Sequence, residues 1–306
     1  MRLVTRSDFD GLACGALLKS LGIIDRWTFV HPKDMQDGKV EVTKDDVLAN
    51  VPYVEGCGMW FDHHASEMVR VGKNVLVPGE CRLAPSAARV IYEYYNGAEE
   101  LPHFAEMVVA TDKVDSGQLT IDEIQNPEGW VLLGFIMDPR TGLGRFRDFT
   151  ISNYDLMVNL LDCCAAMNID EILDLPDVQE RADLYFEQSM LFETMLLEKS
   201  WQDGNVIVTD LRDCSIIHAG NRFMIYSLFP EANVSIWIVD GRGKQNCPVA
   251  VGYSILNRTC KSDIGALMAK YGGGGHKMVG TCQIDYADVD IVVDEMIEKL
   301  KNEDMM

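Results

Sequence analysis

Short apolar segments alternate with polar turns and helices in the first part of the chain, and this pattern restricts the fold more than any other feature. Met1–Thr5 predicts a strand, Ser7–Gly11 a polar turn, and Leu12–Leu21 a helix. Asp46–Ala49 and Gly58–Phe61 predict further buried strands. Strands that alternate with helices form a mostly parallel sheet. We therefore predict an α/β fold.

Polar side chains follow these predicted strands at the points where the strands end. The segment Met-Trp-Phe-Asp-His-His-Ala-Ser-Glu spans residues 59–67 and contains two of only six histidines in the chain. Because the carboxyl ends of parallel strands meet at one edge of the sheet, these side chains are expected to converge. Carboxylates and imidazoles together predict a metal site. The residues at the strand ends are Asp8, Asp10, Asn50, Asp62, His63 and His64.

The pattern changes from helical to strand-like near residue 200. Helical spacing includes residues 106–115 and runs through the middle of the chain to Trp201, with residues 177–200 as its last segment. We expect one domain over residues 1–176, a linker helix over residues 177–201 and a smaller mixed-sheet α/β domain over residues 202–306. The second domain is expected to contain strands at 205–209, 234–239 and 249–255, a helix at 263–270 and a closing amphipathic helix.

Composition limits the classes of partner. The net charge of −21 argues against long duplex nucleic acid, because nonspecific binding to polyanions depends on basic surface. Nine cysteines without a CxxC pair indicate reduced thiols and a cytoplasmic location. The sequence has no run of 18 apolar residues and no signal-peptide pattern, so we expect a soluble protein that does not bind membranes. A phosphate substrate would have to be small and recruited by local cations.

Four consecutive glycines form the second chemical signal, in Tyr271–His276. Glycine loses the most backbone entropy on ordering, so we expect this tract to be neither helix nor strand. Consecutive backbone N–H groups in such a tract can point into one concavity that holds an anion, and His276 would add a donor at its rim. The alternative is a flexible turn with an incidental histidine.

The ordered set of four motifs resembles the DHH phosphoesterase superfamily with a C-terminal DHHA1 domain. The resemblance covers nearly the whole chain and implies a parallel-sheet DHH domain over 1–176 and a substrate-binding DHHA1 domain over 202–306. The motifs, in chain order, are Ser7-Asp8-Phe9-Asp10-Gly11, Asp62-His63-His64, Asp115-Ser116-Gly117 and Gly273-Gly274-Gly275-His276.

This resemblance implies a metal-dependent phosphoesterase that hydrolyses a small nucleotide or a short single-stranded oligonucleotide. Phosphoester hydrolysis needs an attacking hydroxide and relief of negative charge, both of which a pair of divalent ions about 4 Å apart can supply. Mn2+ is the ion that the family commonly uses, with Mg2+ as the alternative. Other expectations on the same scaffold are a catalytically impaired phosphate or nucleotide binder and an exopolyphosphatase-like hydrolase. A homodimer is a further expectation.

The family's metal ligands transfer to this chain by motif position. Asp8 and Asp10 match the ligands of the first motif, and Asp115 matches the ligand of the fourth, with Asp112 one helical turn earlier as the alternative. Asp62 and His63 lie in the Asp-His-His motif, where His63 corresponds to the direct ligand. His64 would act on the phosphate or the leaving group.

Two positions depart from the family pattern. The family's histidine before the first motif is replaced, because the two positions where it occurs are Val4 and Arg6 here. The bridging aspartate of the second motif is replaced by Asn50, which offers one neutral oxygen. We therefore predict one metal ion at most, held by Asp10, Asn50, His63 and Asp115. Arg6 would either grip a phosphate oxygen or form a structural ion pair with Asp8 or Asp10.

In the second domain, the resemblance assigns substrate binding to the glycine tract and to an arginine that precedes it. The residues are Arg258, Gly273, Gly274, Gly275 and His276. Arg82 is either a phosphate contact or a structural residue. His31 and His218 are interpreted as ordinary strand-end residues.

Overall fold

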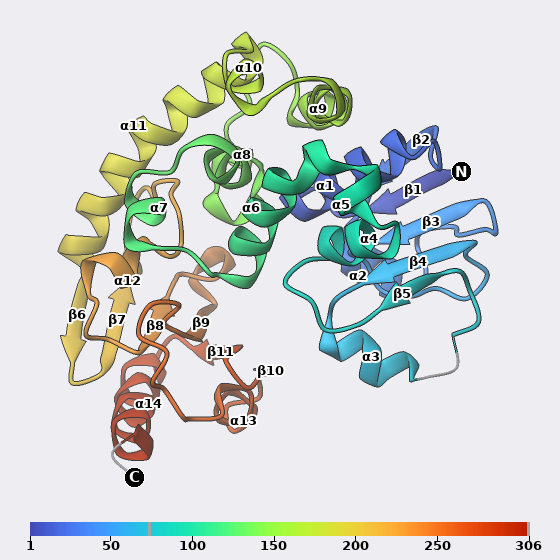
Figure 1. Cartoon of the computed structure of the whole chain (residues 1–306). Helices are drawn as coiled ribbons and strands as arrows, with labels where there is room; N and C mark the ends of the chain where they lie inside the picture. The colour runs from blue at the N-terminus through green and yellow to red at the C-terminus, as the bar shows by residue number, and fades with distance from the viewer. Residues whose placement is uncertain (73–74, 305–306) are drawn as a thin grey trace. The chain divides into compact units, whose positions relative to one another are not determined.

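The computed structural model describes residues 1–72 and 75–304 (Figure 1). The chain divides into two compact units, Met1–Gln118 with Asn126–Tyr185 and Leu119–Gln125 with Phe186–Met306. The first unit contains a five-stranded sheet and the second a six-stranded sheet, with helices in both. The predicted α/β fold, with a parallel sheet followed by a mixed sheet, is confirmed.

All five strands of the first sheet are parallel. Their order is β2-β1-β3-β4-β5, so β1, β3 and β4, the strands expected to end in polar residues, are neighbours. The short strand β5 escaped prediction because it has three residues and begins with Gly79, whose φ is 115°. The strands are β1 (Arg2–Thr5), β2 (Arg26–Phe29), β3 (Asp46–Ala49), β4 (Met59–Asp62) and β5 (Gly79–Cys81).

Alternate residues of β1 face opposite layers of helices. Leu3 lies on the side of helix α1 (Phe9–Ser20), where a Cβ at Gly15 would come 3.2 Å from Leu3 Cδ2 and would overlap Leu161 of helix α9 (Asn153–Ala166). Val4 belongs to a separate cluster with Met35 of helix α2 (Pro32–Gln36). Leu3 and Val4 are fully buried, as the alternation of a strand covered on both faces requires.

The remaining helices of the first unit connect and cover the strands. They are α3 (Ala65–Val71), α4 (Ala87–Tyr94), α5 (Gly97–Glu100), α6 (Ala105–Ser116), α8 (Gly129–Met137) and α10 (Ile169–Leu173), with the 3-10 helices η1 (Pro102–Phe104), η2 (Pro139–Thr141) and η3 (Leu143–Arg145). No helix of the described residues is both long and apolar enough to span a membrane.

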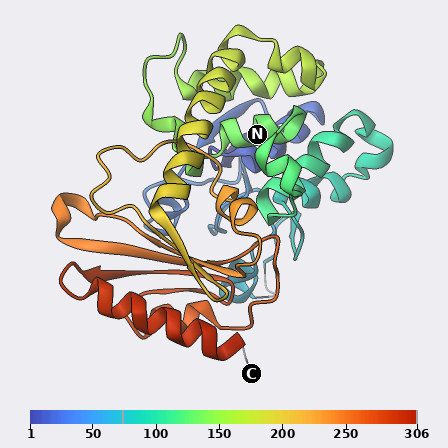
Figure 2. The same cartoon turned by 90° about the vertical axis from the view of Figure 1, so that its left-hand side faces the viewer.

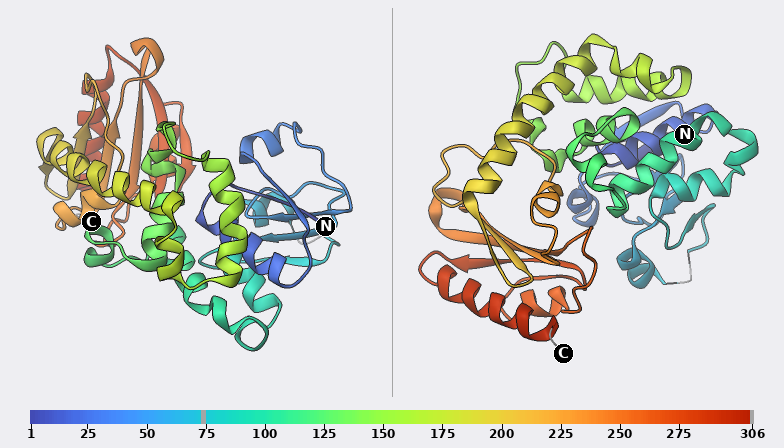
Figure 3. Two further views of the ribbon diagram at one scale, coloured as in Figure 1. Left: turned by 90° about the horizontal axis from the view of Figure 1, so that it is seen from above. Right: turned by 60° about the vertical axis from the view of Figure 1, so that its left-hand side comes forward.

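Helix α11 (Pro176–Lys199) is a continuous helix of 24 residues (Figure 3). Its residues up to Tyr185 belong to the first unit and those from Phe186 onward to the second. The prediction of helix as far as Trp201 was wrong by two residues, because Ser200 and Trp201 belong to strand β6 (Ser200–Asp203) and pair with Thr209 and Val208. The expected domain limits at 176 and 201 stay a prediction.

The sheet of the second unit is mixed, with β7 and β8 parallel and the other pairs antiparallel. Helix α14 lies along one face of this sheet (Figure 2) and buries Val293, Met296 and Leu300 in the same core as Val206 and Val249. The elements are β6 (Ser200–Asp203), β7 (Val206–Asp210), β8 (Val234–Ile238), β9 (Asn246–Tyr253), β10 (Gly274–His276), β11 (Val279–Asp285), α7 (Ile121–Gln125), α12 (Met224–Leu228), η4 (Arg242–Lys244), α13 (Ile264–Ala269) and α14 (Val289–Asp304).

The glycine tract contradicts the expectation that it forms neither helix nor strand. Gly274–His276 is strand β10, which pairs antiparallel with β11 at one edge of the sheet. A Cβ at Gly273 or Gly275 would overlap the backbone of the partner strand, at Thr281 and Val279. These glycines therefore permit a close approach of two backbones, which outweighs their weak intrinsic strand preference.

Helix α1 begins earlier than predicted, at Phe9 instead of Leu12. The Asp8 side chain caps the helix by accepting a hydrogen bond from the backbone N–H of Gly11 at 2.9 Å. Gly11 suits the first turn because a Cβ there would overlap the carbonyl oxygen of Arg6. Asp10 is therefore held on a helix and not in a flexible loop.

An ion pair joins the starts of β1 and β3 and leads to a stability prediction. Arg2 donates to both carboxylate oxygens of buried Asp46, at 2.8 and 2.9 Å, and the backbone N–H of Thr43 donates at 2.7 Å. Burial alone would raise the pKa of Asp46, but the hydrogen bonds from Arg2 and Thr43 lower it more. The resulting stabilisation is present above the unfolded pKa of about 4 and is lost as the pH falls through the folded value.

We expect Asp46→Asn to lower the free energy of unfolding by about 2 kcal/mol at pH 7, the typical worth of hydrogen bonds to a charged group. The difference from wild type should begin to shrink below pH ~4, where Asp46 of the unfolded chain binds a proton, and should vanish as the pH falls through the lower folded pKa. Urea unfolding at several pH values measures both effects. Asp45→Asn is the control because Asp45 is exposed. An equal loss at pH 3 and pH 7 would contradict the assigned role of the charge.

Candidate metal centre

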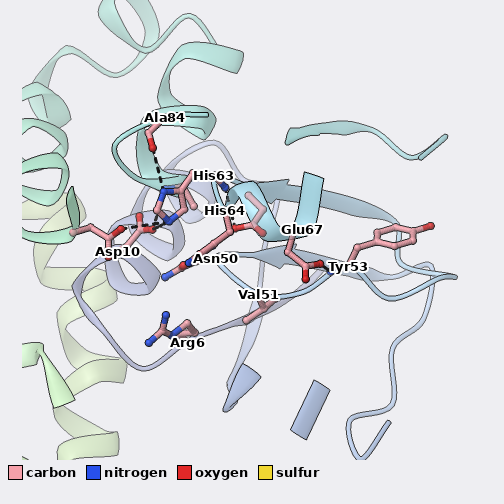
Figure 4. Close-up of polar contacts among 12 residues, drawn as sticks. Arg6, Asp10, Asn50, Val51, Tyr53, His63, His64, Glu67 and Ala84 are labelled. Atoms are coloured by element: carbon pink, nitrogen blue, oxygen red, sulfur yellow. Dashed lines mark hydrogen bonds and ion pairs between the residues drawn. The ribbon is translucent and has the colours of Figure 1, made fainter. Parts of the chain in front are cut away.

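The predicted ligands from the ends of β1 and β4 and from α6 converge in the first unit. Asp10, His63 and Asp115 each offer a ligand atom, and these atoms lie within 4.8 Å of one another. Figure 4 shows the side chains of Asp10 and His63 pointing toward each other. Asp62, His63 and His64 form a second group by the same measure. As expected, Asp10 of the first motif lies close to His63 of the Asp-His-His segment.

Asp10 is fixed by the beginning of helix α4. Its two carboxylate oxygens accept hydrogen bonds from the backbone N–H groups of Ala87 at 2.9 Å and Ala88 at 2.8 Å. Burial, together with the negative charges of Asp115 and Asp8, raises the pKa of Asp10 to about 7 against the opposing effect of His63. Three carboxylates gathered in a largely buried place favour binding of a cation.

His63 presents one ring nitrogen to the same cluster. Its Nδ1 lies 3.2 Å from the carbonyl oxygen of Ala84, which can only accept, so this nitrogen carries the proton. Nε2 lies 3.4 Å from Asp115 Oδ2 and 3.8 Å from Asp10 Oδ2, and it is buried without a hydrogen-bond partner among the described residues. With Nδ1 held by the carbonyl oxygen, Nε2 is the nitrogen that faces the carboxylates and can be offered to a metal.

His64 is oriented by Asp62. The Nδ1 of His64 lies 2.8 Å from Asp62 Oδ1, which also accepts the backbone N–H of His63 at 2.9 Å. Burial lowers the pKa of His64, but the hydrogen bond and the charge of Asp62 outweigh it, so the pKa is raised. Asp62 Oδ2 is buried and has no hydrogen-bond partner among the described residues.

The two positions that depart from the family pattern both contact Asp8. Arg6 Nε lies 3.1 Å from Asp8 Oδ2, and Asn50 Nδ2 donates to Asp8 Oδ1 at 3.0 Å. Asn50 has a left-handed backbone with φ of 56°, which asparagine tolerates, and its Oδ1 is buried without a hydrogen-bond partner in the described structure. One of the alternatives for Arg6, an ion pair with Asp8, is therefore formed.

Arg140 is a charged neighbour of the cluster that sequence reasoning missed. It lines a small hollow together with Asp8, Asp10 and Asp115, and its guanidinium pairs with Asp138 at 2.7 and 3.0 Å. Burial raises the pKa of Asp8, and the charges of Arg6 and Arg140 offset only part of this rise. Arg140 follows an apolar helix and belongs to none of the four motifs, so the sequence carries no local signal for it.

Asp112, the alternative to Asp115, is occupied by other partners. Arg89 donates to Asp112 Oδ2 from Nε at 2.8 Å and from Nη2 at 2.6 Å, while Ser86 Oγ donates to Oδ1 at 2.7 Å. These contacts connect helices α4 and α6 and engage both oxygens of the carboxylate. The geometry therefore favours Asp115 as the ligand.

We expect Asp115→Asn to weaken Mn2+ binding by at least about tenfold, since mutation of a residue that only contacts a metal ligand already lowers metal affinity by about 10–100-fold. Asp112→Asn should leave the Mn2+ affinity within about twofold of wild type and lower the melting temperature instead, because it weakens the charged contact with Arg89. Isothermal titration calorimetry and thermal melting distinguish the two variants. A loss of affinity in Asp112→Asn alone would reverse the assignment.

Other predicted residues have different surroundings. Arg82 pairs with Glu80 at 3.2 Å and with Glu93, which supports the structural alternative for this side chain. His31 is the N-cap of α2, where its Nδ1 accepts the backbone N–H of Lys33 at 3.1 Å. Arg258 is exposed in the second unit and donates to the carbonyl of Ile255 at 2.8 Å. The substrate role of Arg258, Gly273, Gly274, Gly275 and His276 stays a prediction.

The donor set fits a divalent metal ion. Asp10 and Asp115 supply carboxylate oxygens and His63 supplies a nitrogen, the ligand types that suit manganese and magnesium. The unpartnered His63 Nε2 and Asn50 Oδ1 are buried polar atoms that would otherwise cost free energy.

Comparisons with solved structures identify relatives. A pGpG-specific phosphodiesterase, PggH from Vibrio cholerae, is 48% identical to this chain over 99% of both chains, with a TM-score of 0.88. RecJ from Thermus thermophilus in complex with Mn2+ is 12% identical, with a TM-score of 0.54 over 98% of this chain and 52% of that one. An exonuclease RecJ bound to manganese is 13% identical, with a TM-score of 0.54 over 98% of this chain and 89% of that one. The two RecJ structures show likeness of fold alone. No family model and no curated protein matches the chain.

The parallel sheet, the cluster of carboxylates with a histidine, and the likeness to PggH indicate a phosphoester hydrolase. The chain belongs to the DHH phosphoesterase superfamily, as its ordered motifs indicated.

Proposed function

We propose that this chain hydrolyses pGpG, a linear dinucleotide of guanosine with a 5′-phosphate, to two guanosine monophosphates. The main support is the 48% identity to a pGpG-specific phosphodiesterase over 99% of both chains. A net charge of −21 is compatible with such a short substrate, because a dinucleotide needs only a few local cations.

We propose one Mn2+ ion as the cofactor, with Asp10, His63, Asp115 and the Oδ1 of Asn50 as its ligands. Two observations support this set. His63 Nε2 is buried and has no hydrogen-bond partner among the described residues. The ligand atoms of Asp10, His63 and Asp115 all lie within 4.8 Å of one another. When bound, the ion supplies positive charge for the phosphoryl oxygens and makes a water molecule more acidic. The guanidinium of Arg6, which is paired with Asp8, takes the place of a second metal ion as the other positive charge of this centre.

The remaining steps belong to the chain's own residues. Water attacks phosphorus, the bond to the 3′-oxygen of the first nucleoside breaks, and this oxygen must gain a proton. Asp62 binds Nδ1 of His64 at 2.8 Å, so Nε2 is the nitrogen that delivers the proton to the leaving oxygen. Arg6 contacts Asp8 through Nε, and its terminal nitrogens hold the phosphate. Arg258 and the Gly273–His276 segment hold the distal phosphate in this proposal.

A panel of substrates tests the proposal. With Mn2+ present, liquid chromatography should show conversion of pGpG to guanosine monophosphate, with slower turnover of pApA, adenosine 3′,5′-bisphosphate and polyphosphate. Tight binding of pGpG without any product would favour the alternative of a catalytically impaired binder. Release of phosphate from polyphosphate at the highest rate would favour the exopolyphosphatase-like alternative.

We also propose that the enzyme works in the cytoplasm, which its nine free cysteines support because such thiols persist in a reducing compartment. A homodimer stays a prediction that sedimentation velocity measures directly.

A further inference from the structure

A second cavity of the first unit lies beside the metal-binding cluster. Its volume is about 230 Å³, just below the range of about 300–1,000 Å³ that is usual for small-molecule sites, so it suits one small group of a ligand and not a whole dinucleotide. Ser7, which precedes Asp8 in the chain, lines it, and Asp138 lines both this cavity and the small hollow that contains Asp8, Asp10 and Asp115. A group in this cavity would therefore be a short distance from a phosphate held at the cluster.

The lining of the cavity combines apolar walls with cationic or polar groups. Ile136, Leu143 and Leu156 are buried apolar residues, and Phe149 adds an aromatic ring. Arg147 is exposed at the cavity and has no ion pair or hydrogen bond among the described residues. Apolar walls with few polar groups are typical of sites that hold a flat aromatic ring, such as a nucleobase.

Buried Arg181 fixes the orientation of one polar group in this lining. Arg181 is 2% exposed and donates from Nε to Asn153 Oδ1 at 3.0 Å. Its other nitrogens donate to the carbonyl oxygens of Asp177 and Ile151, both at 2.7 Å. Because a guanidinium has no acceptor, the amide of Asn153 must turn its oxygen toward Arg181. Asn153 Nδ2 makes no hydrogen bond within the described structure, so its two protons are free to donate.

The cavity therefore offers donors, from Asn153 Nδ2 and the Arg147 guanidinium. Guanine presents two acceptors, O6 and N7, along one edge, whereas adenine presents N7 beside the N6 amino donor. We infer that this cavity binds one guanine base of the dinucleotide and that Asn153 selects guanine over adenine. The inference rests on the proposed hydrolysis of pGpG and adds the residue that determines base specificity.

Asn153→Asp tests the inference with little disturbance of the fold. An aspartate keeps the oxygen that accepts from Arg181, and a negative charge in the first turn of α9 is favourable, but the Nδ2 donor is lost. The KM for pGpG is expected to rise about tenfold or more, since a base contact is worth about 1–3 kcal/mol, with kcat nearly unchanged. The KM for pApA should stay the same or fall, because aspartate can accept from N6.

Asn159→Asp is the matched control, because it makes the same charge change at an exposed position of the same helix outside the cavity. Arg147→Gln provides a second variant at an exposed side chain, and it should also raise the KM for pGpG. If wild type hydrolyses neither dinucleotide, the proposed function fails first. If wild type prefers pGpG and both cavity variants keep its KM and its preference, the assignment of this cavity is overturned.

Discussion

His63→Ala is expected to lower kcat for pGpG hydrolysis more than about a hundredfold, since mutation of residues that only contact a metal's ligands already lowers activity by about 10–100-fold. The variant removes the buried Nε2 that lies 3.4 Å from Asp115 Oδ2. Removing this nitrogen leaves Asp10 and Asp115 as the two remaining ligands of this group, so Mn2+ affinity should fall together with turnover. Steady-state kinetics over a range of Mn2+ concentrations measures both quantities.

His103→Ala is the control for this prediction, because His103 is exposed and lies outside both groups of candidate ligands. It should retain wild-type turnover. Full activity of His63→Ala at saturating Mn2+ would remove His63 from the site. A loss of kcat with unchanged Mn2+ affinity would assign it to proton transfer instead.

Asn50→Asp should tighten Mn2+ binding at the cluster and destabilise the metal-free protein. The substitution restores the carboxylate that the family uses between its metals, at a position whose φ of 56° aspartate tolerates. Without metal, the new charge is buried 3.0 Å from the Asp8 carboxylate, in place of the Asn50 amide that now donates to it. An uncompensated buried charge costs about 3–5 kcal/mol, so the melting temperature in chelator should fall clearly below that of wild type.

Addition of Mn2+ should reverse this loss, because an ion that binds only the folded state stabilises it by mass action. Elemental analysis after dialysis gives the number of ions. Asn96→Asp is a matched control, since Asn96 also has a left-handed backbone, with φ of 53°, but lies outside both groups of candidate ligands. Two tightly bound ions in wild type would refute the prediction of a single metal.

The sequence predicted the elements whose signals are local. The strands before Asp62 and Asn50 are runs of apolar residues, and their carboxyl ends had to meet once the sheet was parallel. The start of α1 was placed too late because Asp8 acts as a cap, which looks like a turn in sequence. Strand β10 depends on contact with β11, and intrinsic preference gives no sign of that pairing.

The candidate site was predictable only as far as its motifs extend. The motifs named Asp10, His63 and Asp115, but they could not separate Asp115 from Asp112, because the two are one helical turn apart. The contact of Arg89 with Asp112 favours Asp115, and it depends on the packing of two helices. Arg140 and Asn153 are distant from Asp8 in sequence and belong to no motif, so only the folded chain brings them into consideration.

The attachment of Asp10 to the first N–H groups of helix α4 has a consequence for recovery of the enzyme after metal removal. Both carboxylate oxygens are tied to the main chain, so the side chain keeps its rotamer whether or not a cation is present. Chelated enzyme should consequently regain full activity as fast as the ion diffuses in, without a slow rearrangement. The start of helix α4 therefore holds Asp10 in its ligand position before the ion arrives, and only the ion has to be added from solution.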